Sequence, residues 1–144
     1  MPTKIVTTLT EHTSRFRAST DALGEIRKFV SGQARQYGFG EEDIDDIRLA
    51  VDEACTNIIK HAYEWRDDKY IYIRIAMHNN EMLVSIYDNG KSFDAGRYSV
   101  PALQDQLDQK KRGGYGIYLI RKLMDKVEYR KQRSRNEIRM TKKR

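Results

Sequence analysis

The sequence predicts a two-layer α/β sandwich, in which helices cover one face of a mixed, mostly antiparallel sheet. Strand-like and helical segments follow one another in the order β-α-α-β-β-loop-α-β-β. Because helices do not alternate strictly with strands, a purely parallel sheet is not expected. The 144 residues contain only two prolines and no internal repeat, and this length suits one domain and leaves little room for two. We therefore expect a single domain over residues 1–144.

The composition fits a folded protein that needs neither a membrane nor an oxidising compartment. Hydrophobic residues make up 39% and charged residues 33% of the chain, which argues against disorder. No apolar run approaches the roughly 20 residues that span a bilayer, and the first ten residues lack the pattern of a secretion signal. The single cysteine, Cys55, excludes an internal disulfide and a zinc site with several cysteine ligands. We expect a cytoplasmic location.

Positive charge is concentrated in the last quarter of the chain. The net charge is +6, but residues 109–144 contain 14 Lys and Arg against 3 Asp and Glu, whereas the other 108 residues contain 13 against 18. A basic segment of this kind can meet nucleic acid, phosphate ligands or an acidic protein partner. A solvated surface has the same composition, so charge alone does not choose among these uses.

The N-terminal part predicts a strand and then a helix. Lys4–Thr10 is rich in β-branched residues and predicts a strand, and Ser14–Ser19 is either a second strand or its continuation. Ser19 or Thr20 can cap a helix, and Gly38 and Gly40 can end it. The apolar positions of this helix recur at steps of three and four: Leu23, Ile26, Val30 and Ala34.

A second helix is predicted over Glu41–Tyr63. Its first turns are rich in Asp and Glu, which are favourable beside the positive end of the helix dipole. Its apolar residues again fall on one face: Ile44, Ile47, Val51, Ala54, Ile58 and Ala62. Two helices with one apolar stripe each are suited to covering one face of a sheet.

The C-terminal half predicts four strands, a long connection and a helix after it. Tyr70–Met77 and Met82–Tyr87 have strand character and are separated by an Asn-Asn turn. The connection Lys91–Arg112 has weak periodicity, with a short helix expected near Ala102–Gln109, and connections of this length are more often functional. Apolar residues over Ile117–Met124 predict the helix. A strand, a turn and a last strand follow at Val127–Lys131, Arg133–Asn136 and Ile138–Lys142.

A first group of polar residues lies on the second predicted helix. Glu53, Asn57 and His61 are spaced by four, so we expect them on one helix face, beside the apolar stripe. A carboxylate and an amide at the boundary of a core are costly unless they are paired or used. Glu53 can act as a general base, and Asn57 offers a neutral oxygen of the kind that Mg²⁺ accepts with phosphate oxygens and water. An exposed helix face has the same pattern, so this group alone assigns no site.

Two further groups follow the second helix. Asp88 ends a strand and can accept a hydrogen bond from an exocyclic amine such as that of adenine, and Gly90 permits close approach of a flat ring. The same residues also form an ordinary turn. Immediately before the last predicted helix, three cations and three glycines can cradle phosphate oxygens with backbone N–H groups, or can form a hinge. These residues are Lys110, Lys111, Arg112, Gly113, Gly114 and Gly116.

In this fixed order, the three groups resemble those of the GHKL ATPases, the superfamily of histidine kinases, gyrase and heat-shock chaperones. Within it the chain is most similar to the anti-sigma factor serine kinases of bacterial stress and sporulation signalling. Three segments carry the resemblance: Ile47–Tyr63, Tyr87–Asp94 and Gly113–Asp125. The resemblance implies a histidine-kinase-like ATPase domain over nearly the whole chain.

The resemblance also implies roles for individual residues. Glu53 would be the catalytic general base and Asn57 the ligand of Mg²⁺. Asp88 would receive the adenine amino group of ATP, with Gly90 against the ring and Thr141 assisting through water. The phosphates would be bound by the glycine loop and its cations, namely Lys111, Arg112, Gly113, Gly114 and Gly116, with Lys110 as a further candidate.

The function implied is that of an ATP-dependent serine protein kinase. Such a kinase phosphorylates an anti-anti-sigma factor of the STAS type and sequesters a sigma factor, and it is expected to be a homodimer. An alternative is a nucleotide-binding, partner-switching module of the same fold without efficient phosphoryl transfer. A nucleic-acid-binding protein is a further alternative, but Tyr129 is the only aromatic residue of the last hairpin that could stack on a base, so no direct nucleic-acid partner is expected.

Overall fold

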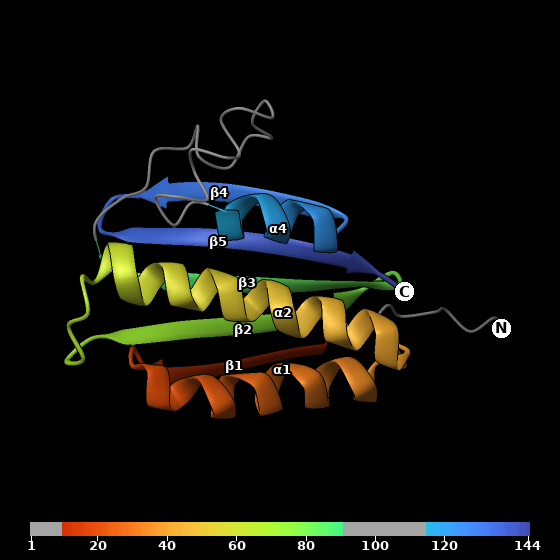
Figure 1. Ribbon diagram of the computed structural model, residues 1–144. Helices are drawn as coiled ribbons and strands as arrows, with labels where there is room; N and C mark the ends of the chain where they lie inside the picture. Colours follow the sequence, from red (N-terminus) through yellow and green to blue (C-terminus); the bar gives the residue numbers. More distant parts are fainter. Residues whose placement is uncertain (1–9, 91–114) are drawn as a thin grey trace, which may run out of the picture.

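The computed structural model describes residues 10–90 and 115–144, which form a five-stranded sheet with helices against one face (Figure 1). The two-layer α/β sandwich predicted from the sequence is confirmed. The helices are α1 (Leu23–Gln36), α2 (Glu41–Asn57) and α4 (Tyr115–Leu123), with a 3-10 turn η1 (Thr20–Ala22) and a π-helical turn η2 (Ile58–Ala62). The strands are β1 (Thr10–Arg17), β2 (Tyr70–His78), β3 (Glu81–Asp88), β4 (Lys126–Gln132) and β5 (Arg135–Lys143).

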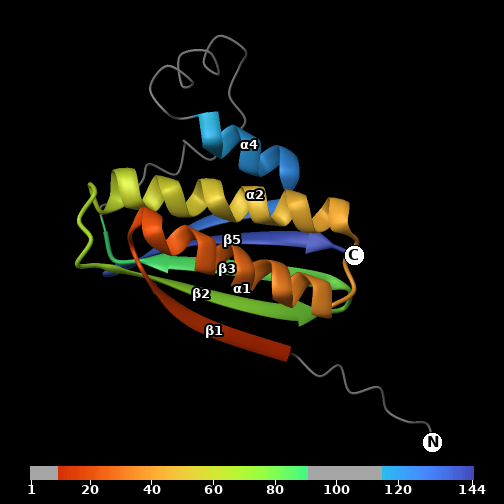
Figure 2. The same cartoon turned by 60° about the horizontal axis from the view of Figure 1, so that its bottom comes forward.

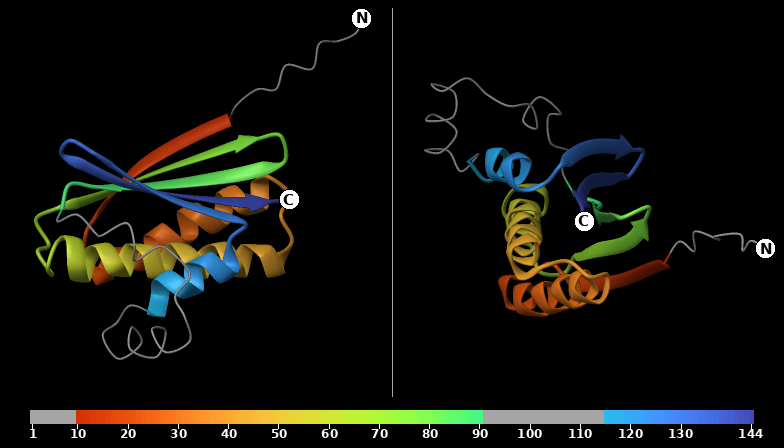
Figure 3. Two further views of the ribbon diagram at one scale, coloured as in Figure 1. Left: turned by 90° about the horizontal axis from the view of Figure 1, so that it is seen from above. Right: turned by 90° about the vertical axis from the view of Figure 1, so that its right-hand side faces the viewer.

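The sheet has the order β1-β2-β3-β5-β4, and every pair of neighbouring strands that the structure describes is antiparallel. Successive side chains of a strand point to opposite faces. On β2, Ile71, Ile73 and Ile75 are therefore buried beneath the helices, while Tyr70 and Tyr72 point to the other face. Figures 2 and 3 show all three helices on the same side of the sheet, so that no described element covers its opposite face.

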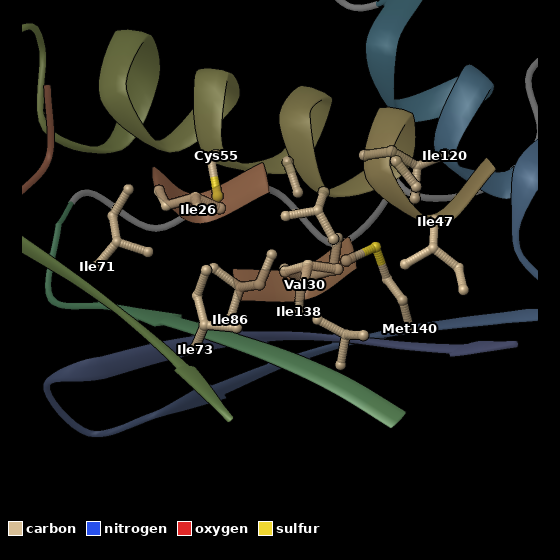
Figure 4. Packing of buried hydrophobic residues seen from close by; sticks show 14 of the residues in the cluster. Ile26, Val30, Ile47, Cys55, Ile71, Ile73, Ile86, Ile120, Ile138 and Met140 are labelled. Carbon is tan, nitrogen blue, oxygen red and sulfur yellow. The ribbon is translucent and has the colours of Figure 1, made fainter. Parts of the chain in front are cut away.

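The core lies between the helices and the sheet (Figure 4). Ile26 and Val30 of α1 and Ile47 of α2 are fully buried against the isoleucines of β2 and β3. Burying one side chain of this size contributes about 1.5–3 kcal/mol, so this layer provides most of the stability of the fold. Burial also raises the pKa of the Cys55 thiol, which makes it an unreactive packing residue.

Helix α4 lies beside α2 and runs in the opposite direction. The Lys142 ammonium group of β5 fixes its C-terminal end, because it donates hydrogen bonds to the Leu123 carbonyl oxygen at 2.6 Å and to the Asp46 carboxylate at 3.3 Å. The N-terminal end of α4 consequently lies beside the C-terminal part of α2. None of the helices formed by residues 10–90 and 115–144 is long and apolar enough to cross a bilayer.

Several predicted boundaries differ from the observed ones. The strand predicted at Lys4–Thr10 lies outside the described residues except for Thr10, and the Ser14–Ser19 segment belongs to β1 as far as Arg17. The short helix predicted near Ala102–Gln109 also lies outside them. The last turn is shorter than predicted, because β5 already begins at Arg135.

The second predicted helix is not α-helical throughout. After Asn57 it widens into the π-helical turn η2, in which the Tyr63 N–H bonds to the Ile58 carbonyl oxygen at 2.8 Å. Each residue of a π-helix advances by a smaller angle than in an α-helix, so residues beyond Asn57 leave the α-helical register. His61 lies in this π-helical turn, and its alignment with Glu53 and Asn57 stays a prediction.

Candidate functional site

The predicted site begins where α4 meets α2. Glu53 and Asn57 are one turn apart on α2, and Gly116 at the start of α4 lies directly against them. A Cβ atom at Gly116 would overlap Glu53 Oε2 and would lie 3.7 Å from Asn57 Nδ2. Two elements that are about 60 residues apart in sequence thus bring three predicted residues together. The positive end of the α4 dipole faces this contact and favours an anionic ligand there.

The turn after β3 reaches the other end of the same helical segment. Gly90 lies against Ala62 of η2, and a Cβ atom at Gly90 would overlap the Ala62 carbonyl oxygen and lie 2.9 Å from the Ala62 Cβ. A side chain at position 90 would therefore push β3 away from the helix end. The approach of a flat ring to Gly90, which the sequence analysis expects, is a different contact and stays a prediction.

Asp88 is the buried carboxylate of this turn, with 4% of its surface exposed. Its Oδ1 accepts hydrogen bonds from the Gly90 N–H at 2.8 Å and from Asn136 Nδ2 at 3.0 Å. Burial raises the pKa of Asp88, and the two hydrogen bonds oppose that rise. Within residues 10–90 and 115–144 both bonds fall on Oδ1, so Oδ2 is the oxygen that remains for a ligand donor.

Asn136 is a residue of this site that the sequence analysis missed. It is 3% exposed, and it lies opposite Asp88 in the β3–β5 register. Its Nδ2 also donates to the Gly90 carbonyl oxygen at 3.1 Å, while its Oδ1 accepts from the Tyr129 hydroxyl at 3.2 Å. Asn136 therefore fixes both the carboxylate of Asp88 and the backbone of the turn. The signal that could have found it is an amide directly across from a buried aspartate on the neighbouring strand.

The structure does not bring Thr141 to this site. Thr141 pairs with Leu83, five residues along the strands from the pair formed by Asp88 and Asn136, a separation of about 17 Å. Its side chain also points to the opposite face, where it lines a hollow with Leu83 and Lys126. The predicted position beside Asp88 is instead occupied by Asn136. Asn136 and Thr141 are an odd number of residues apart on one strand, so their side chains face opposite sides of the sheet.

Tyr63 connects the helix end to the turn. Its hydroxyl donates to the Tyr70 carbonyl oxygen at 2.6 Å and accepts from the Asn89 N–H at 2.9 Å. Tyr63 is buried, and burial raises the pKa of its hydroxyl to about 12, so it stays protonated and can donate at any physiological pH. Together with Asn136 it holds the turn of Asp88 and Gly90 from two sides.

The remaining predicted residues of the glycine loop lie outside the described part of the chain: Lys110, Lys111, Arg112, Gly113 and Gly114. Within the described part, no three His, Cys, Asp or Glu side chains form a metal-binding group. Mg²⁺ does not need one, because it takes most of its ligands from phosphates and water. An amide that is 6% exposed, as Asn57 is, beside a carboxylate and a helix N-terminus fits this mode of binding.

Comparisons with known proteins identify the family of the chain. A family model described as the histidine kinase-like ATPase domain matches residues 16–142. The chain therefore belongs to the histidine kinase-like ATPase family. Its relatives include serine-protein kinase RsbW of Bacillus pumilus, which is 37% identical over 120 residues that cover 77% of this chain and 72% of the relative. Serine-protein kinase RsbW of Bacillus subtilis is 36% identical over 117 residues, with 76% and 71% covered.

Two solved structures have the same fold at low sequence identity. The RsbU and RsbW domains of a Mycobacterium tuberculosis protein match with a TM-score of 0.67 at 16% identity, covering 93% of this chain and 32% of that one. The SiaB-SiaC complex of Pseudomonas aeruginosa matches with a TM-score of 0.64 at 15% identity, covering 90% and 88%. At the level of family, the chain groups with the proteins named serine-protein kinase RsbW within the histidine kinase-like ATPase family.

Proposed function

We propose that this protein is an ATP-dependent serine protein kinase that phosphorylates an anti-anti-sigma factor of the STAS type and sequesters a sigma factor. We further propose that it works in the cytoplasm as a homodimer. The observation that carries the kinase proposal is the contact of Gly116 with Glu53 and Asn57, which puts a helix N-terminus beside a carboxylate and a buried amide. The identity of 35–37% to RsbW serine kinases supports the same reaction.

The residues have distinct tasks in this proposal. Asp88 Oδ2 accepts a hydrogen bond from the adenine amino group, and the adenine ring lies against Gly90, next to the Asp88 carboxylate that accepts the Gly90 N–H. The ATP phosphates lie at the N-terminus of α4, where backbone N–H groups and the helix dipole stabilise negative charge. Glu53 orients the hydroxyl of the substrate serine and accepts its proton as the hydroxyl oxygen attacks the γ-phosphorus.

Asn57 would hold Mg²⁺ through its side-chain oxygen. When bound, the ion neutralises charge on the phosphates. Lys111 and Arg112, with Gly113 and Gly114, would complete the phosphate contacts, in agreement with their place just before α4. Phosphoryl transfer of this kind depends mostly on position and charge, so the short distance between Glu53 and the start of α4 is the essential geometric requirement.

A transfer assay with a matched control tests the proposal. The protein is incubated with γ-labelled ATP, Mg²⁺ and the STAS protein of the same organism, and the label on the STAS serine is measured. Glu53→Gln should lower transfer by at least about 100-fold, the contribution of a general base. Glu42→Gln changes an exposed carboxylate on the same helix and should transfer normally. Full transfer by Glu53→Gln would remove Glu53 as the base.

The second candidate function is a nucleotide-dependent binding module that does not transfer phosphate. Asp88, Gly90 and the start of α4 serve it equally well, because they concern nucleotide binding alone. The position of Glu53 against Gly116 favours the kinase, since binding does not require a base at that place. Calorimetric binding of ATP without any label on the STAS protein would establish the module instead.

A further inference from the structure

One face of the sheet is not covered by any described helix (Figure 3), and tyrosine and arginine residues gather at one end of that face. Strand alternation places these residues opposite the buried isoleucines, and the tyrosines are half-buried while the arginines are exposed. We call this set the Tyr–Arg patch: Arg15, Arg17, Tyr70, Tyr72, Tyr87, Arg130 and Arg135.

The patch extends across all five strands. The register pairs Arg15 with Tyr72, Tyr72 with Tyr87, Tyr87 with Glu137, and Glu137 with Arg130. Directly paired residues of antiparallel strands have their side chains on the same face, so these five form one continuous row. Arg17 and Tyr70 lie beside the row at its β1 end, and Arg135 lies beside it on β5.

Two of the arginines are held against the sheet by tyrosine rings. The guanidinium carbon of Arg15 lies 4.3 Å from the centre of the Tyr70 ring, and that of Arg135 lies 4.2 Å from the centre of the Tyr87 ring. Stacking of this kind uses the flat side of the guanidinium and leaves its N–H donors free in the plane. The side chains are thus partly ordered before any partner arrives, which reduces the entropy cost of binding.

The four arginines of the patch form no ion pair with any residue in the described part of the chain. The single acid in the central row, Glu137, is 3% exposed and already pairs with Arg139 at 3.1 Å. The other end of the same face is mixed in charge, with Glu11 paired to Arg74 and Lys126 near Glu128. Among the arginines that the described strands place on this face, those without an ion pair therefore all belong to the Tyr–Arg patch.

Three arginines of α1 and α2 differ in this respect. Arg27 is paired with Asp52 at 2.8 Å, Arg35 with Glu41 at 3.0 Å, and Arg48 with Asp45 at 2.7 Å. These arginines already have carboxylate partners, and a ligand would have to compete with them. No carboxylate within residues 10–90 and 115–144 forms an ion pair with the arginines of the patch.

We propose that the Tyr–Arg patch is a docking surface for an acidic protein segment, whose carboxylates pair with the exposed guanidinium groups. A second copy of this chain would oppose four positive charges with four more, which is unfavourable. A single nucleic-acid strand stacks its bases on free aromatic faces, and those of Tyr70 and Tyr87 are already covered by arginine. The patch is separate from the nucleotide site, so this proposal does not depend on kinase activity.

Fluorescence anisotropy with a labelled twelve-residue peptide of alternating Glu and Gly tests the proposal. The Arg15→Glu/Arg135→Glu variant should bind the peptide at least about tenfold more weakly at low salt, because each reversal replaces an attraction with a repulsion. Lys126→Glu/Lys143→Glu makes the same change in net charge at the far end of the same face and should bind nearly as the wild type does. Thermal melts check that both variants fold, and Arg15→Gln/Arg135→Gln replaces the first variant if it does not.

Four results would overturn the proposal. In the first, the wild type fails to bind the peptide. In the second, both charge-reversal variants lose affinity equally, which means that binding depends only on the net charge of the protein. A labelled twelve-nucleotide single-stranded DNA binds more tightly than the peptide and is lost with Arg15→Glu/Arg135→Glu, which assigns the patch to nucleic acid. Finally, sedimentation shows that the wild type is a dimer and that Arg15→Glu/Arg135→Glu is a monomer, which assigns the patch to contact with a second copy of the chain.

Discussion

Asn136 provides the sharpest test of the nucleotide site. Asn136→Ala removes the two hydrogen bonds that Nδ2 donates, to Asp88 Oδ1 at 3.0 Å and to the Gly90 carbonyl oxygen at 3.1 Å, and also the acceptor of the Tyr129 hydroxyl. Asp88 then keeps only the Gly90 N–H at 2.8 Å among the bonds described above. Its carboxylate becomes free to turn, and the pKa of Asp88 rises further because a donor that opposes the effect of burial is lost.

The magnitude follows from the bonds that are lost. A hydrogen bond to a charged group contributes about 1.5–3 kcal/mol, and a neutral one contributes about 1 kcal/mol. If orientation of Asp88 is required for adenine binding, losing the charged bond should weaken ATP binding by roughly tenfold to a hundredfold, since 1.4 kcal/mol corresponds to a factor of ten. Loss of the bonds to Asp88 and Gly90 should also lower the free energy of unfolding by about 2–4 kcal/mol.

Isothermal titration calorimetry with ATP, well below the melting temperature of each variant, measures the effect on affinity. Thr141→Ala is the matched control, because it truncates another buried polar residue of β5 that faces away from Asp88. It should bind ATP with the affinity of the wild type. The reasoning is refuted if Asn136→Ala binds as the wild type does, or if Thr141→Ala is the variant that loses ATP.

Three further predictions concern other contacts. Gly116→Ala should weaken ATP binding by at least about tenfold in calorimetry, because the methyl group can enter only if the Glu53 carboxylate moves at a cost of about 1–3 kcal/mol; unchanged affinity would contradict the contact. Asp88→Asn should abolish ATP binding yet keep the fold. The pKa of Asp88 is raised above its ordinary 3.8, so the wild type should lose stability relative to this variant as the pH rises above about 4. A difference in melting temperature between the two proteins that stays constant from pH 4 to 8 would contradict this prediction. Glu64→Gly should raise the melting temperature by about 2–4 °C, since Glu64 has a φ of 49° and left-handed backbone costs about 1 kcal/mol outside glycine; a lower melting temperature would argue against strain there.

The sequence was sufficient for the elements that depend on local pattern. Ile71, Ile73 and Ile75 alternate with polar residues, and β2 buries them as predicted. The apolar spacing of Ile26 and Val30 likewise predicted the buried face of α1. Both periodicities follow from backbone geometry alone, so they can be recognised without knowing the contacts made by the rest of the chain.

Features that depend on distant contacts were not predictable in the same way. The π-helical turn η2 forms where Gly90 of a different element lies against Ala62, and the apolar spacing of the helix contains no sign of that contact. Asn136 was placed in a turn, because the last hairpin has several polar residues and its register with β3 cannot be read from either strand alone. The resemblance suggested Thr141 for the same reason. Thr141 is five residues beyond Asn136 on the same strand, so both positions fit a strand, but their side chains point to opposite faces of the sheet.

The two glycine contacts explain why the predicted residues converge on one place. Gly116 contacts the Glu53 side chain of α2, and Gly90 contacts the Ala62 backbone of η2, so a glycine lies against the helical segment at each of these two positions. Asn57 lies between these contacts, at the last α-helical residue before the π-helical turn. A π-helical turn at this point changes the direction of every later residue while leaving Glu53 and Asn57 on one face. The segment therefore makes two contacts at once: Glu53 and Asn57 face α4, and Ala62 meets the turn that carries Asp88. In a uniform α-helix the direction of Glu53 and Asn57 would also fix the direction of Ala62.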